Sequence, residues 1–149
     1  MAEKPGNPIF ALLLALAVAG CIVFLLETLS QQVMPLPEGI DPLDPVQLKA
    51  ALEAGELPWL GMGLVLGGWL LGAYAGGRVV MQVARREWVL LVFAGLFTAV
   101  VVSTLMAFPH PTWMWLAGPL SVLVGTWLGM RLGGVLGGAP GGVDPAATA

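Results

Sequence analysis

The sequence predicts an all-α membrane protein built as a bundle of four transmembrane helices. Four stretches are each mostly apolar over the roughly 20 residues that a spanning helix needs; they are Ile9–Leu26, Trp59–Val83, Trp88–Phe108 and Thr112–Leu132. Hydrophobic residues make up 58% of the chain and charged residues only 10%, whereas a soluble domain carries roughly 25% charged residues. We therefore expect a single multi-pass membrane domain.

The positive charges are distributed unevenly between the two sets of helix ends. Five of the six Lys and Arg residues lie at one set, and these are Lys4, Arg78, Arg85, Arg86 and Arg131. Segments rich in Lys and Arg stay on the cytoplasmic side of a membrane, so both termini are predicted to lie inside the cell. The expected location is the inner (plasma) membrane of a bacterium, with the lipid bilayer as the first partner.

The boundaries of the elements follow from the ends of the apolar runs. We expect transmembrane helices at about 9–30, 57–83, 87–108 and 112–132, all within one domain that covers residues 1–132. The segment 133–149 consists mainly of Gly, Ala and Pro. Such a composition cannot bury a core, so this segment is predicted to be a flexible tail.

The first helix contains the only cysteine, and two interpretations of it are open. Val18-Ala19-Gly20-Cys21 resembles a lipoprotein signal, in which the chain is cut before a cysteine that then receives a lipid. However, the apolar run continues through Leu26, and the preceding segment lacks the clear positive charge of a signal peptide. We therefore favour a small residue within a membrane helix. A single cysteine also rules out an internal disulfide.

The segment between the first two helices is rich in proline and in acidic residues. Asp44 followed by Pro45 is typical of a helix start, so we expect a short helix over 46–54, stopped by Gly55. It is expected to lie on the outer membrane surface or to cap the bundle. The acidic residues here are Glu38, Asp41, Asp44, Glu53 and Glu56, against the single base Lys49. This charge could attract cations or a basic partner, or it keeps an exposed loop solvated; it matches no calcium-binding loop.

Small residues recur at four-residue spacing along the predicted helices. They include Gly68, Gly72 and Gly76 in the second helix, Gly125, Gly129 and Gly133 in the fourth, and Gly95, Ala99, Ser103 and Ala107 in the third. Membrane helices associate through such residues, because small side chains let two backbones approach closely. The pattern predicts a compact bundle. It can also present a packing face to another copy of the chain or to another membrane subunit.

Two tryptophans are predicted deep in the membrane, away from its boundaries. Trp69 and Trp127 each follow an outer tryptophan by a distance of about 15–18 Å, at 1.5 Å per helical residue, and Tyr74 lies one turn further in. These side chains could contact an apolar ligand such as a quinone, a carotenoid or a lipid tail. Alternatively, they fill the space beside neighbouring glycines.

Polar residues near the membrane provide one candidate site, made of Glu27, His110 and Arg78. Glu27 is expected at the outer end of the first helix and His110 in the outer hairpin, whereas Arg78 is expected near the inner interface. A His–Glu pair can bind a metal or relay protons. One histidine and scattered acids do not form a metal signature, and no catalytic motif is present. We therefore expect no metal, no cofactor and no nucleic-acid partner.

Several short motifs suggest a relationship to other proteins. They are the run Leu36–Pro42, the pairs Gly68-Trp69 and Gly76-Gly77, and Pro109-His110-Pro111 before Trp113. In these features the chain resembles small uncharacterised four-transmembrane-helix proteins of bacteria. The resemblance implies a four-helix inner-membrane protein and no particular activity.

Three functions are compatible with these patterns. The favoured one is a non-enzymatic accessory or scaffold subunit that packs through its small-residue stripes. The second is a small oligomeric transporter or channel for a small or apolar solute. The third is a membrane enzyme, which would require Glu27 and His110 to converge.

Overall fold

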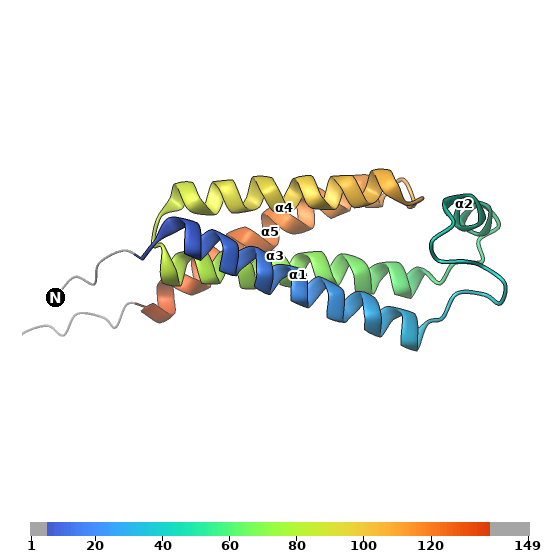
Figure 1. The fold of residues 1–149 in the computed structure, drawn as a ribbon, viewed down its shortest axis with the longest axis horizontal. Coiled ribbons are helices and arrows are strands. Elements are labelled where there is room, and N and C mark those ends of the chain that lie inside the picture. Colours follow the sequence, from blue (N-terminus) through green and yellow to red (C-terminus); the bar gives the residue numbers. More distant parts are fainter. Residues whose placement is uncertain (1–5, 138–149) are drawn as a thin grey trace, which may run out of the picture.

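The computed structural model describes residues 6–137, and every regular element in this part of the chain is a helix (Figure 1). The helices are α1 (Pro8–Val33), α2 (Pro45–Glu53), α3 (Trp59–Val83), α4 (Glu87–Ala107) and α5 (Met114–Gly137). Three of them, α1, α3 and α4, are long and apolar enough to cross a membrane. The predicted all-helical class is confirmed. Most of the predicted tail, 133–149, lies outside the described residues.

The start and end of α1 are set by local chemistry. The side chain of Asn7 accepts hydrogen bonds from the backbone N–H groups of Ile9 and Phe10, and Pro8 occupies the first helical position. The helix then continues to Val33, two residues before Pro35, because no residue breaks it earlier. The prediction that Glu27 ends this helix was therefore wrong: Glu27 lies inside α1, with further helical turns beyond it.

α3 packs against α1 in antiparallel orientation through its glycines. A Cβ atom at Gly72 would lie 3.0 Å from the carbonyl oxygen of Ala19, and one at Gly76 would lie 3.1 Å from that of Ala15. As the number rises along α3, the number of the contacting residue falls along α1. Hydrogen in place of a side chain therefore lets the two backbones touch.

The opposite side of α3 packs against α5 in parallel orientation, also through glycines. A Cβ atom at Gly125 would meet the carbonyl oxygen of Leu70, and one at Gly129 would meet that of Tyr74. A Cβ atom at Gly77 would in turn lie 3.0 Å from the carbonyl oxygen of Thr126. All six predicted packing glycines lie at the contacts of α3 with α1 or α5. Thus α3 is the central helix of the bundle.

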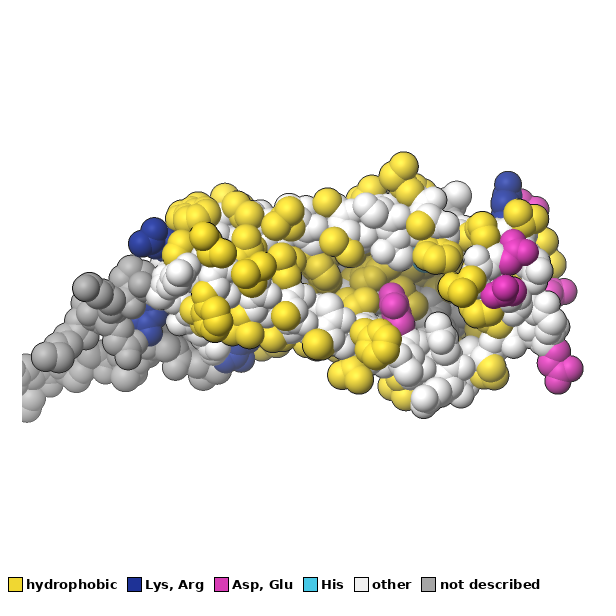
Figure 2. All heavy atoms as spheres, viewed as in Figure 1, with side chains coloured by type: hydrophobic (Ala, Val, Ile, Leu, Met, Phe, Trp, Pro, Cys, Tyr) yellow, Lys and Arg dark blue, Asp and Glu magenta, His cyan; other side chains and the backbone are white. Residues whose placement is uncertain are grey.

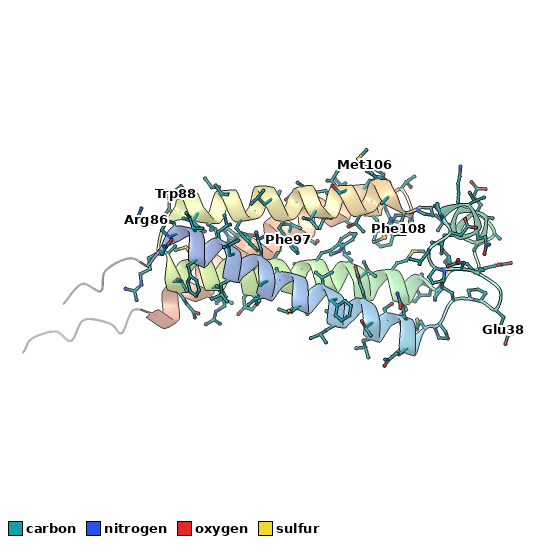
Figure 3. All side chains as sticks on the ribbon, in the orientation of Figure 1. Glu38, Arg86, Trp88, Phe97, Met106 and Phe108 are labelled. Carbon is teal, nitrogen blue, oxygen red and sulfur yellow. The ribbon has the colours of Figure 1, made fainter. Side chains whose placement is uncertain are left out.

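α4 is attached to the bundle mainly by large side chains. The rings of Phe93 and Phe97 stack 5.8 Å apart and are buried on its inner side, and Figure 3 shows Phe97 pointing inward and Met106 outward. The predicted packing stripe of this helix points the other way. A Cβ atom at Gly95 would have no neighbour within 4 Å, and Ala99 and Ser103 are exposed. Within this chain, the stripe on α4 is therefore not a packing face.

The two ends of the bundle differ in charge (Figure 2). Arg85 and Arg86 form the turn between α3 and α4, and the backbone N–H of Gly6 donates to the carbonyl oxygen of Val83 at 2.9 Å, which fixes the start of α1 at this end. At the other end, Asp44 caps the start of α2, and its side chain accepts from the N–H of Val46 at 2.9 Å. The acidic segment around α2 therefore lies opposite the arginines.

Candidate functional site

A cavity lies at the α2 end of the bundle, where α1 and α4 diverge (Figure 1). Its volume is about 550 Å³. Residues of α1, of the start of α3, of the acidic segment and of the α4–α5 hairpin line it, and most of them are apolar. They include Met34, Leu36, Leu43, Leu48, Leu57, Met62, Phe108 and Met114. The polar residues in this lining are few, so each of them matters for what the cavity can hold.

A second hollow, a lateral groove of about 340 Å³, continues from the cavity between α1 and α4. Its floor is formed by buried residues, chiefly Trp69 and Val101, which are 2% and 1% exposed. Its rim includes Phe24 and Val100, which are largely exposed. The groove therefore opens on the side of the bundle, on an apolar surface of the kind that lipid covers.

Glu27 belongs to the walls of both the cavity and the lateral groove. Within residues 6–137, the Glu27 carboxylate forms no ion pair and no hydrogen bond. Removing a carboxylate from water is costly unless a partner compensates it. Glu27 is therefore the group of this site that most needs a ligand.

His110 lines the cavity from the hairpin between α4 and α5. Its Nδ1 lies 2.8 Å from the carbonyl oxygen of Phe108. A carbonyl oxygen can only accept, so Nδ1 carries the hydrogen, and Nε2 of the neutral ring is left as an acceptor. The imidazole also lies beside the indole of Trp69, with ring centroids 6.3 Å apart. These two contacts hold the histidine ring against the cavity wall.

Two hydroxyl groups complete the small polar set. The Ser30 hydroxyl donates to the carbonyl oxygen of Gly61 at 3.2 Å. The Thr104 hydroxyl donates to the carbonyl oxygen of Val100 at 3.1 Å. Ser30 lines the cavity, and Thr104 lines both the cavity and the groove. Each hydroxyl hydrogen is thus used within the protein, which leaves only oxygen lone pairs for a ligand.

The structure divides the predicted polar site into two parts. Glu27 and His110 line the same cavity, although no hydrogen bond joins them in the described part of the chain. Arg78 lies near the other end of α3, where its guanidinium donates to the Tyr74 hydroxyl at 3.2 Å and lies 6.0 Å from the centroid of that ring. Arg78 is therefore not part of the cavity.

The three aromatic residues predicted to contact an apolar ligand are also separated in the structure. Only Trp69 lies at a hollow, as the floor of the lateral groove. Trp127 is 49% exposed on the outside of α5, and Arg131 lies 5.2 Å from the centroid of its ring. Tyr74 lies beside Arg78 and lines neither hollow.

Sequence reasoning missed the groove itself and its residue Thr104. A signal was present on α1, where Gly20, Val23, Phe24 and Glu27 recur at helical spacing on one face. A Cβ atom at Gly20 would have no neighbour within 4 Å, unlike one at a packing glycine. Among the described residues no group of three His, Cys, Asp or Glu side chains is placed to hold a metal ion.

Comparison with known proteins identifies no relative. No protein-family model, no curated protein and no solved structure matches the chain. The resemblance to small four-helix membrane proteins therefore stays a prediction. What the site does must be argued from its own geometry.

Proposed function

We propose that this chain is a small integral membrane protein that binds an amphiphilic molecule from the surrounding lipid. The observation that carries the proposal is the joining of two hollows at Glu27: an apolar groove open to the side, and a larger cavity at the end of the bundle. An amphiphile has a chain suited to the groove and a polar head suited to the cavity. Apolar walls with a few converging polar groups are the usual form of a ligand site.

The accessory or scaffold role is the second candidate, and a different surface supports it. The predicted packing glycines of α3 and α5, Gly68, Gly72, Gly76, Gly125, Gly129 and Gly133, are used for packing within the bundle, so they offer no face to a partner. The small residues of α4, in contrast, are exposed, with open space at Gly95. A second copy or another membrane subunit would approach there.

The proposed topology has four spans, with α5 as the fourth and with both termini in the cytoplasm of a bacterium. The arginines at one end of the bundle and the acidic segment at the other support this orientation. α2 would then lie at the outer membrane surface. The cavity would open toward the outer face, and the lateral groove toward the outer leaflet.

Reporter fusions test this topology. A reporter fused after Leu132 should be active only in the cytoplasm, and one inserted at Gly39, in the turn before α2, only outside, because positively charged loops resist translocation. Reporter activity of the two fusions in intact cells is the measurement. An outward C-terminus would contradict the four-span proposal.

A groove-filling substitution tests the proposed function. Gly20→Leu should place a side chain in the lateral groove without striking the backbone, because nothing lies within 4 Å of a Cβ atom there. We expect labelling of the full-length protein by a monoacylglycerol with a photoreactive chain to fall by about tenfold, the loss that about 1.4 kcal/mol of binding free energy produces. The uncharged head of this probe keeps the test independent of Glu27.

Gly95→Leu is the matched control for this experiment. It makes the same chemical change on a transmembrane helix, also into open space, but away from both hollows. Labelling should match that of the unmodified chain. If Gly20→Leu labels as strongly as Gly95→Leu, no amphiphile occupies the groove, and the proposed function is wrong.

A further inference from the structure

We infer that the site selects amphiphiles whose head group is a protonated amine. This inference rests on the proposed function and adds the chemical class of the ligand. It follows from counting the hydrogen-bond donors and acceptors that the cavity offers, because a ligand head must supply what the cavity lacks.

The polar side chains of the site mainly present hydrogen-bond acceptors. The hydrogens of the Ser30 and Thr104 hydroxyls and the Nδ1 hydrogen of His110 are all donated to backbone carbonyl oxygens. What they leave toward a ligand is two hydroxyl oxygens and the Nε2 lone pair. The Glu27 carboxylate adds two more acceptor oxygens and a negative charge. A head group that only accepts hydrogen bonds would find few partners here.

Donors and positive charges are scarce in the lining. No Lys or Arg lines either hollow in the described part of the chain. Pro42, Pro58 and Pro109 also line the cavity, and proline has no backbone N–H. In the lining that residues 6–137 provide, two side chains have donors with no acceptor in the protein: the exposed amide of Gln31 in the cavity and the indole N–H of Trp69 in the groove. A phosphate or carboxylate head would therefore lie beside Glu27 with little to compensate the repulsion.

An ammonium head satisfies the same set of groups. It carries hydrogens for the Glu27 carboxylate, and a hydrogen bond between two charged groups is stronger than a neutral one. The hydrocarbon chain of the ligand would lie in the groove against Val101 and Phe97.

The surrounding charge favours the same ligand. The acidic segment next to the cavity carries Glu38, Asp41, Asp44 and Glu56, while its only base, Lys49, lies 3.9 Å from Glu53. Figure 3 shows Glu38 at the far end of this segment. A negative surface raises the local concentration of cations.

The test compares dodecylammonium, dodecanol and dodecanoate as competitors of the photoreactive monoacylglycerol, on the full-length protein in neutral detergent near pH 7. The three share one chain and differ in head-group charge. We expect dodecylammonium to displace the probe at a concentration at least about tenfold lower than dodecanol, and dodecanoate to be the weakest. Phosphatidylethanolamine and phosphatidylglycerol serve as lipid competitors, and displacement by the first alone would identify the source of the ammonium as a membrane lipid.

Substitutions assign the preference to Glu27. Glu27→Gln should remove the advantage of dodecylammonium, Glu27→Asp should keep it, and Glu53→Gln on the exposed face of α2 should change nothing. Equal binding of the three competitors, or an advantage that survives in Glu27→Gln, would overturn the ammonium class while leaving amphiphile binding intact. Labelling that no competitor displaces and that Gly20→Leu does not reduce would overturn the proposed function instead.

Discussion

Gly129→Leu should separate α3 from α5 and strongly destabilise the bundle. A Cβ atom at this position would meet the carbonyl oxygen of Tyr74 and lie 3.0 Å from the backbone nitrogen of Arg78. These are backbone atoms, so no side-chain rotation can relieve the collision. We expect the free energy of unfolding to fall by roughly 3 kcal/mol or more, which is the upper end of the range for inserting extra atoms into a packed core.

The measurement is thermal unfolding of the purified protein in detergent. A loss of about 3 kcal/mol corresponds to a Tm roughly 6–12 °C lower for a domain of this size. Gly95→Leu, on the exposed face of α4, is the control and should leave the Tm within a few degrees. An unchanged Tm for Gly129→Leu would mean that α3 and α5 do not touch.

Trp69→Ala should lower the stability by a similar amount through the loss of a buried ring. The indole is 2% exposed; it contacts the ring of His110, and its edge would lie 2.9 Å from a Cβ atom at Gly118. Truncating a buried Trp to Ala typically costs about 3–5 kcal/mol. We expect a loss of roughly 3 kcal/mol in the free energy of unfolding, at the lower end of this range. In a membrane the hydrophobic effect contributes less to helix packing than it does in a soluble protein.

Trp127→Ala is the matched comparison, since this tryptophan is 49% exposed on α5. Its Tm should change by a small fraction of the change in Trp69→Ala. Similar losses in the two variants would contradict the assignment of Trp69 as the buried residue that supports the floor of the groove.

The sequence predicts where the helices lie more successfully than it predicts which face of each helix packs against a neighbour. Long apolar runs locate α1, α3 and α4 because lipid demands about 20 apolar residues in a row. The same spacing of small residues occurs on α3 and on α4, yet only the stripe on α3 packs within the chain. Spacing shows that two backbones can approach; which helix is the neighbour depends on the arrangement of the whole bundle.

The candidate site was predictable in part for the same reason. Glu27 and His110 could be assigned to one side of the membrane from the charge distribution, and the structure places both at one cavity. The groove depends on the divergence of α1 and α4, which are not adjacent in sequence. No local pattern encodes such a divergence. Glu27 was wrongly expected at the end of this helix, because nothing stops α1 before Val33, two residues ahead of Pro35.

The central position of α3 has a mechanical consequence. At Gly72 and Gly129 its backbone lies directly against the backbones of α1 and α5. Backbones in direct contact cannot shift past one another without colliding. α4 is held instead by side chains such as Phe93 and Phe97, which have rotamers to exchange. The bundle therefore combines three helices in direct backbone contact with a fourth helix that is held by side chains. Because α4 forms one wall of the groove, we expect a bulky ligand to displace this helix rather than the other three.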